Sequence, residues 1–144
     1  MTLNSAHVAV MLLNASDNGS SPIGDFDGAN GTFIVPSNGA SLVCRLNQAS
    51  SSTTANTTKK GYFLANRSAS NAVQMDLNGS QLGTAATASS ALPTAAMQVC
   101  ARNGVFSDNP VALGHWGSSL TSTDRQNIYR RAFLPILRYL SLVA

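Results

Sequence analysis

The sequence predicts an all-β fold, namely an antiparallel β-sandwich that ends in one C-terminal helix. Apolar and polar residues alternate over several short segments, and clusters of turn-forming residues separate these segments. Helical spacing of apolar residues occurs only late in the chain, whereas a parallel α/β sheet would require helices between its strands. At 144 residues the chain fits one domain, which we expect to span residues 1–144.

Three strands are predicted in the first 60 residues. His7–Leu13 is a continuous apolar run, which is typical of a strand buried on both faces. Thr32–Val35 is a short strand that ends at Pro36, and Ser41–Leu46 is a third strand with apolar residues at alternate positions. Gln48–Thr58 is rich in Ser and Thr and has no apolar period, so we expect a surface loop there.

A hairpin is the clearest local signal of the second half. Val73–Leu77 alternates apolar and polar residues and is followed by Asn78-Gly79. A type I′ turn needs positive φ at both central residues, which Asn and Gly adopt at low steric cost. Ser80–Thr84 should therefore return beside Val73–Leu77. Further strands are predicted at residues 62–65, 97–101 and 111–115.

A helix should close the chain over about residues 122–142. Thr121 is the predicted N-cap, and Asp124 three residues later completes a variant of the capping box. Pro135 should kink or restart this helix because it lacks an amide donor. We expect the apolar side chains of the segment to pack against the core or to contact an assembly partner: Phe133, Leu134, Leu137 and Leu140.

Three stretches of the second half carry a resemblance to a known family: GYFLANRSASNAVQMDLNGSQLG, ALPTAAMQVCARNG and NPVALGHWGSSLTSTDRQNIYRR. Their order resembles the C-terminal half of the concanavalin-like, laminin-G-type jelly-roll modules of bacteriophage structural proteins, such as tail-fibre or decoration proteins. The resemblance implies a jelly roll and a virion context. Family members are usually longer at the N-terminus, so the opening strands of the module would be missing here. His7–Leu13 would then be an edge that another strand or subunit covers, and we expect an oligomer.

The charge pattern is local. Charged residues make up 10% of the chain, the net charge is +3, and four of the nine basic residues fall in the predicted helix: Arg125, Arg130, Arg131 and Arg138. We interpret them as complementing the helix dipole and solvating its outer face, so no nucleic-acid partner is expected. The longest early apolar run is too short to cross a bilayer, and we expect no membrane insertion.

The cysteine and histidine positions predict neither a disulfide nor a metal. No secretory signal is recognisable, so we expect Cys44 and Cys100 to be buried free thiols. The two Cys and two His residues lack metal-ligand spacing, and no metal or cofactor is expected.

Two clusters are candidate carbohydrate-binding residues. Asp25, Asp27 and Asn30 lie in GDFDGANG, where their oxygens would suit a sugar or calcium, although a turn explains the segment more simply. His115 and Trp116 end a predicted strand, where an indole can stack on a sugar ring and an imidazole can bind its hydroxyls. The alternative is that Trp116 packs under the helix or at a subunit contact while His115 is a satisfied neighbour.

A catalytic grouping is not expected. Retaining glycosidases use two carboxyl groups about 5 to 5.5 Å apart, and this chain has no Glu. The leading hypothesis is a non-enzymatic bacteriophage virion protein, a tail-fibre, baseplate or capsid-decoration component that assembles with other virion proteins. Its location would be the virion, assembled in the host cytoplasm. The alternative is a carbohydrate-binding module that recognises a host surface glycan.

Overall fold

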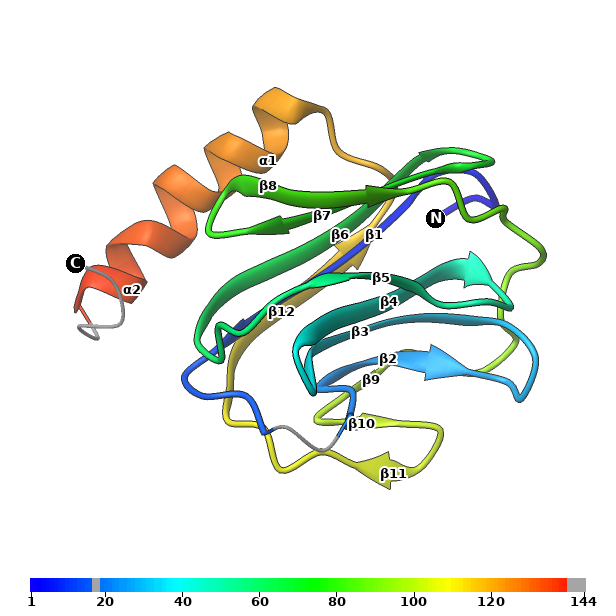
Figure 1. Cartoon of the computed structure of the whole chain (residues 1–144), viewed down its shortest axis with the longest axis horizontal. Helices are drawn as coiled ribbons and strands as arrows, with labels where there is room; N and C mark the ends of the chain where they lie inside the picture. Colours follow the sequence, from blue (N-terminus) through cyan, green and yellow to red (C-terminus); the bar gives the residue numbers. More distant parts are fainter. Residues whose placement is uncertain (17–18, 140–144) are drawn as a thin grey trace.

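The computed structural model describes residues 1–16 and 19–139, and within them two five-stranded antiparallel sheets pack face to face (Figure 1). The first sheet contains, in spatial order, β12 (Val111–Gly117), β1 (Ala6–Leu12), β6 (Gly61–Ala69), β7 (Ala72–Leu77) and β8 (Ser80–Ala85). The second contains β5 (Ser52–Ala55), β4 (Ser41–Gln48), β3 (Gly31–Asn38), β2 (Ile23–Phe26) and β9 (Gln98–Val99). The predicted antiparallel sandwich is confirmed.

Strand β1 is a central strand, so the expectation that His7–Leu13 forms a sheet edge is wrong. Val8 lies opposite Ala65 of β6 on one side and opposite Trp116 of β12 on the other. All seven residues of β1 are buried, as the continuous apolar run predicted. The edge position belongs to β12, which the chain itself supplies after the hairpin. The backbone of β1 therefore needs no strand from another chain.

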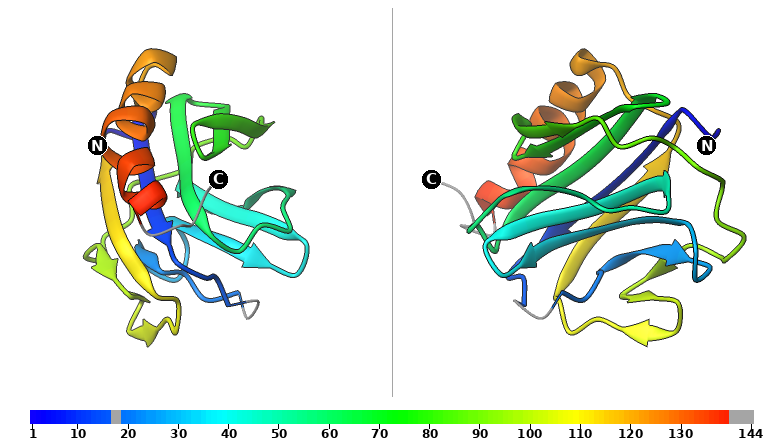
Figure 2. Two further views of the ribbon diagram at one scale, coloured as in Figure 1. Left: turned by 90° about the vertical axis from the view of Figure 1, so that its left-hand side faces the viewer. Right: turned by 45° about the vertical axis from the view of Figure 1, so that its right-hand side comes forward.

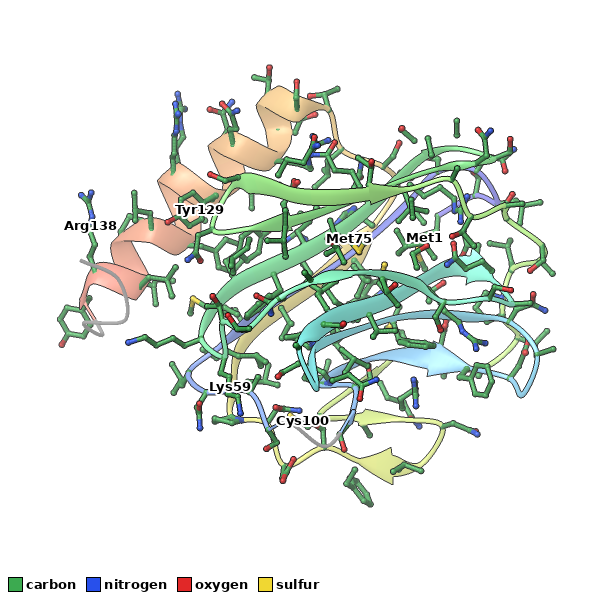
Figure 3. All side chains as sticks on the ribbon, in the orientation of Figure 1. Met1, Lys59, Met75, Cys100, Tyr129 and Arg138 are labelled. Carbon is green, nitrogen blue, oxygen red and sulfur yellow. The ribbon has the colours of Figure 1, made fainter. Side chains whose placement is uncertain are left out.

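The main core lies between the two sheets. Alternate residues of β1, including Val8 and Val10, face this core and meet Ile34 and Leu42 of the second sheet. Figure 3 shows Met75 within this interior. The opposite face of β1 carries Ala9 and Met11, which belong to a second apolar cluster outside the sandwich.

That second cluster is covered by a continuous helical segment composed of α1 (Ser122–Ile128), the π-helical turn η1 (Tyr129–Phe133) and α2 (Leu134–Tyr139). Figure 2 shows this segment against the first sheet, on the side away from the second sheet. Phe133 and Leu137 are buried there against Tyr62 and Leu64. No helix among residues 1–16 and 19–139 is long and apolar enough to cross a membrane.

The predicted N-cap and the predicted disturbance at Pro135 both have a structural counterpart. Asp124 N donates to Thr121 Oγ1 and Thr121 N donates to Asp124 Oδ2, which confirms the capping box. Leu134 N donates to Tyr129 O, one residue farther back than in an α-helix. The helical register therefore shifts just before Pro135, whose missing donor was expected to disturb the helix. The predicted residues 140–142 lie outside the described part of the chain.

Several local predictions need correction. Gln48–Thr58 is not only a loop, because Ser52–Ala55 forms β5 against β4. The strand predicted at 97–101 is interrupted at Cys100, which has a φ of 59° and is exposed rather than buried. Cys44 is buried, and both thiols are free. The chain after Cys100 forms an unpredicted hairpin of β10 (Ala101–Arg102) and β11 (Val105–Phe106), and β2 was also not predicted.

The hairpin of β7 and β8 is confirmed, with φ values of 51° at Asn78 and 76° at Gly79. The β10–β11 hairpin has the same turn chemistry, with φ values of 51° at Asn103 and 73° at Gly104. The two turns differ in their surroundings. A Cβ atom at Gly79 would overlap the ring of Tyr129, whereas a Cβ at Gly104 would meet no atom within 4 Å.

Gly79→Ala is therefore expected to lower the free energy of unfolding more than Gly104→Ala. Each substitution carries a backbone penalty of about 1–2 kcal/mol for the left-handed conformation. Overlap with Tyr129 should add about 1–3 kcal/mol at Gly79 only, because the helical segment must shift. Urea denaturation of the two variants measures the difference. Equal losses would show that the β7–β8 turn does not pack on the helix.

Candidate functional site

The two sequence-predicted clusters do not meet in one site. Asp25, Asp27 and Asn30 lie at the β2–β3 turn of the second sheet, whereas His115 and Trp116 lie on the edge strand of the first. Neighbouring residues of a strand point to opposite faces. His115 lies opposite Ala9 on the helix-covered face, and Trp116 lies opposite Val8 on the other face. His115 and Trp116 therefore cannot contact the same sugar ring.

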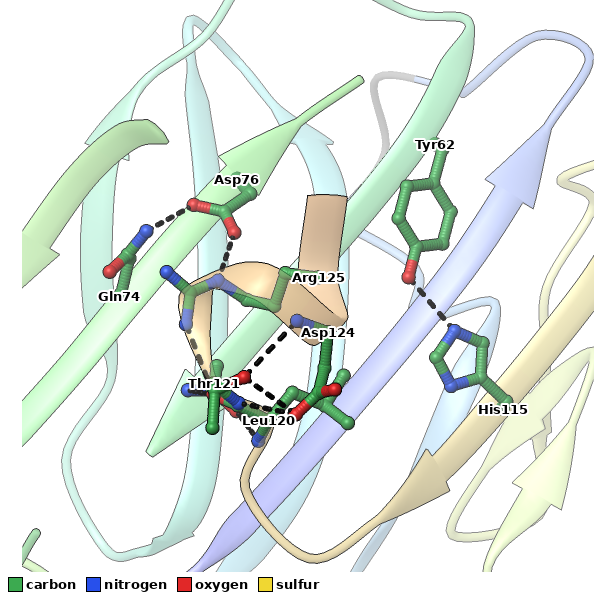
Figure 4. Close-up of polar contacts among 9 residues, drawn as sticks. Tyr62, Gln74, Asp76, His115, Leu120, Thr121, Asp124 and Arg125 are labelled. Atoms are coloured by element: carbon green, nitrogen blue, oxygen red, sulfur yellow. Dashed lines mark hydrogen bonds and ion pairs between the residues drawn. The ribbon is translucent and has the colours of Figure 1, made fainter. Parts of the chain in front are cut away.

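His115 belongs to a chain of hydrogen bonds beneath the helical segment, part of which is drawn in Figure 4. The carbonyl of Ser118 can only accept, so His7 Nδ1 must donate to it, at 2.6 Å. In neutral His7, Nε2 then accepts from His115 Nδ1 at 2.8 Å. His115 Nε2 in turn accepts from the Tyr62 hydroxyl at 2.9 Å. Both histidine tautomers follow from this order.

Burial keeps both imidazoles neutral. It lowers the pKa of His7 below 6.5 despite the hydrogen bond to Ser118, and it lowers the pKa of His115 to about 4, with a further contribution from His7. Both ring nitrogens of His115 are already bonded. His115 is therefore a satisfied residue of the packed layer, which is the alternative that the sequence left open. Its nitrogens are not available to a sugar.

Trp116 is 44% exposed and lies on the face opposite the helix. The expectation that it packs under the closing helix is wrong, because the strand alternation places His115 there instead.

Asp27 is the centre of a turn. Its Oδ1 accepts from the backbone N–H groups of Ala29 and Asn30, and its Oδ2 accepts from Thr94 N. These donors hold the pKa of Asp27 below its usual range. The side-chain oxygen of Asn30 accepts from Ser90 Oγ. The predicted turn is thus present, and its oxygens serve the fold itself.

Asp25 differs from Asp27 because it is buried. Its Oδ1 accepts from Thr32 N at 2.6 Å, and burial raises its pKa to about 6. Among the described residues, no three His, Cys, Asp or Glu side chains are grouped to hold a metal ion.

A surface of two arginines and two phenylalanines lies next to this turn and was missed by the sequence analysis. We call Phe26, Phe33, Arg45 and Arg102 the Arg–Phe platform. The Arg45 guanidinium carbon lies 5.1 Å from the ring centre of Phe26 and 5.6 Å from that of Phe33. The corresponding distances for Arg102 are 5.8 and 4.2 Å. The two rings meet edge to face at 6.3 Å.

The strand register of the second sheet positions this platform. Ile34 faces the main core, so its neighbour Phe33 faces outward, opposite Arg45 of β4 and Gly24 of β2. A side chain at Gly24 would overlap Phe33, so glycine leaves the space for the ring. Arg102 reaches the same rings from β10. Alternation in β3 and β4 could have placed Phe33 and Arg45 together, but nothing local indicates Arg102.

The residues expected to form an assembly contact lie mostly against the chain itself. Phe133 and Leu137 are buried by the first sheet, which is the core-packing alternative, so these two residues are not free for the assembly contact that was the other alternative. Leu134 is partly buried, and Leu140 lies outside the described residues. Arg125 pairs with Asp76 at 2.7 Å (Figure 4), whereas Arg138 projects from the helix end (Figure 3).

No family model matches the chain, and no curated protein matches it. Among solved structures, the chain is similar to domain 4 of AbnA, a GH43 extracellular arabinanase from Geobacillus stearothermophilus, in complex with arabinotriose. The TM-score is 0.58 at 12% identity, and the match covers 87% of this chain and 65% of that one. The chain therefore spans less than two thirds of that structure's length. The likeness concerns the fold, a sandwich of the concanavalin-like, jelly-roll type.

Acidification from pH 6.5 to pH 4 is expected to lower stability through His115. Its pKa in the folded chain is about 4, so in this window the unfolded chain binds a proton that the folded chain excludes. The loss is about 2 kcal/mol after allowance for partial exposure. Asp25 acts oppositely, because its raised pKa lets the folded chain take up a proton first.

Urea denaturation at several pH values separates these two contributions. His115→Gln should flatten the loss of stability on acidification, whereas Asp25→Asn should steepen it. An unchanged pH dependence in the His115 variant would contradict a neutral, hydrogen-bonded His115 in the folded protein.

Proposed function

We propose that this protein is a non-catalytic glycan-recognition module that binds its ligand at the Arg–Phe platform. The observation that carries this proposal is the pair of guanidinium groups that lie over two rings at a sheet face that no helix covers in the described part of the chain (Figure 2). The first sheet, by contrast, has its outer face occupied by the helical segment. The similar solved structure, domain 4 of AbnA in complex with arabinotriose, is consistent with sugar binding by such a sandwich.

The platform has the chemistry that a sugar surface requires. A guanidinium that stacks on a ring keeps its N–H donors in its own plane, where they can reach hydroxyl oxygens. The aromatic rings hold the guanidinium planes in place, so less side-chain entropy is lost on binding. The platform therefore supplies oriented donors on a pre-formed surface.

The state of the two nearby carboxyl groups supports the non-catalytic part of this proposal. Asp27 is occupied by three backbone donors, which disfavour its protonated form and its use as a general acid. Asp25 is buried and bonded to Thr32. We therefore assign both groups to the turn rather than to chemistry on a glycosidic bond.

A second candidate function, assembly as a bacteriophage virion component, is supported by the β10–β11 hairpin. Val105 and Phe106 of this hairpin are 67% and 83% exposed. Exposed apolar side chains of this size suit a contact with another virion protein or with a second copy. The virion context comes from the resemblance in the second half of the sequence. Assembly and glycan binding are compatible, because several copies on one particle would add avidity.

Phe26→Ala is expected to weaken glycan binding about tenfold, because both guanidiniums lose one of their two supporting rings. A glycan array followed by calorimetry on the best ligand measures this, and the bound oligosaccharide should be recovered intact. Phe106→Ser is the matched control and should bind as the wild type does. Glycan binding that survives Phe26→Ala unchanged would place the site elsewhere.

The reverse result is expected for assembly. Phe106→Ser should abolish self-association or attachment to particles, since it removes the most exposed ring of the hairpin. Light scattering at several concentrations, with and without virions, provides the measurement, and Phe26→Ala serves as the control. A monomer that ignores virions in both variants and in the wild type would exclude the assembly role.

A further inference from the structure

We propose that the Arg–Phe platform selects glycans that carry carboxylate groups, such as oligosaccharides of uronic acids. This inference rests on the proposed glycan binding and names the chemical class of its ligand.

The first step of the argument is that the platform concentrates positive charge. Both guanidiniums lie over the same two rings, between 4.2 and 5.8 Å from the ring centres. Burial and the nearby Arg45 charge lower the pKa of Arg102. Two like charges held together on an apolar surface oppose each other, and a bound anion would relieve this repulsion.

The second step is that this charge has no acidic partner within residues 1–16 and 19–139. Arg45 donates only to neutral oxygens, to Ser51 Oγ at 3.2 Å and more weakly to the carbonyl of Ala29 at 3.4 Å. Among the residues that the structure describes, the Arg102 guanidinium has only its contacts with the two rings. The carboxylate of Asp27 is directed to three backbone N–H groups instead.

Other arginines of the same chain show what the platform lacks. Arg67 is fully buried and donates to the side chain of Gln48 and to several backbone carbonyls. Arg125 is paired with Asp76. Both are compensated inside the protein, as buried charges usually are. Arg45 is partly buried and makes only two hydrogen bonds to neutral atoms, and the partly buried Arg102 guanidinium makes none among the described residues, so we expect a ligand to supply the missing acceptors.

The third step concerns shape. A planar guanidinium fork matches the two oxygens of a carboxylate, and such paired bonds are stronger than bonds to neutral hydroxyls. Beside Arg102 lies a hollow of about 200 Å³, lined also by small residues that include Gly19 and Ser21. The hollow leaves room for the substituents of a sugar ring whose carboxylate meets Arg102. A neutral sugar would not reduce the repulsion between the Arg45 and Arg102 charges.

The test uses oligosaccharide pairs that differ only in oxidation at C6: galactose and galacturonate, glucose and glucuronate, mannose and mannuronate trimers. The intact chain is titrated with each by calorimetry. We expect at least one acidic trimer to bind ten or more times tighter than its neutral counterpart, with an advantage that shrinks as salt rises. Arg45→Gln and Arg102→Gln should each remove this preference, and Arg102→Lys should reduce it, because the charge remains while the fork is lost.

Arg131→Gln is the matched control, since it removes an exposed arginine from the helix and should leave binding unchanged. Circular dichroism melts establish that each variant is folded. Equal binding of neutral and acidic trimers that is weakened by Phe26→Ala would overturn the acidic preference while leaving glycan binding intact. Binding of no trimer would contradict the proposed function as well. Competition by inorganic phosphate as effective as that by the acidic trimer would reduce the platform to a general anion site.

Discussion

The burial of strand β1 on both faces is the constraint from which the arrangement of the chain follows. An apolar strand of this kind needs a covering layer on each side, and a single sheet-on-sheet contact provides only one. The second layer is the helical segment, which places Phe133 and Leu137 over Ala9 and Met11. Full burial of each such side chain contributes about 1.5–3 kcal/mol. The segment is therefore part of the folded module and not an apolar tail kept for a partner.

Covering the first sheet also explains the hydrogen-bonded chain beneath the helix. Tyr62 and His115 lie in the layer that the helix removes from water, and Phe133 stacks on Tyr62 with ring centres 4.1 Å apart. Polar groups in such a layer must find partners, because each unpaired group costs about 1–3 kcal/mol. The hydrogen bonds from Tyr62 to His115, from His115 to His7 and from His7 to the Ser118 carbonyl satisfy these groups, with each donor pointing in the same direction along the series. The same arrangement of Tyr62 and His115 thus fills the apolar layer and pairs the polar atoms in it.

The sequence predicted the features that depend on neighbouring residues. The Asn78-Gly79 hairpin, the Thr121 capping box and the turn at Asp27 each follow from local chemistry, and each is present. The central position of β1 could not be read in this way, because it depends on β12, which lies about a hundred residues later. Ser52–Ala55 has no apolar period, and only its pairing with β4 makes it a strand.

The candidate site was harder to predict than the fold for the same reason. Asp27 could be placed in its turn, but the platform joins Phe33 and Arg45 of paired strands with Arg102 of a distant hairpin. The left-handed conformation at Cys100 interrupts the expected strand directly before Ala101, and this break precedes the hairpin that brings Arg102 to the rings. The backbone conformation at Cys100 thus helps to place Arg102 over the same two rings as Arg45.

The two outer faces of the sandwich are consequently suited to different tasks. On the first sheet, charge is neutralised internally, as in the Asp76–Arg125 pair, and the surface is closed by the helix. On the second sheet, Arg45 and Arg102 lie over apolar rings, and neither has an acidic partner among the described residues. Contacts with the rings favour the two guanidiniums but supply no acceptor for their N–H groups. In the function that we propose, the ligand would supply those acceptors.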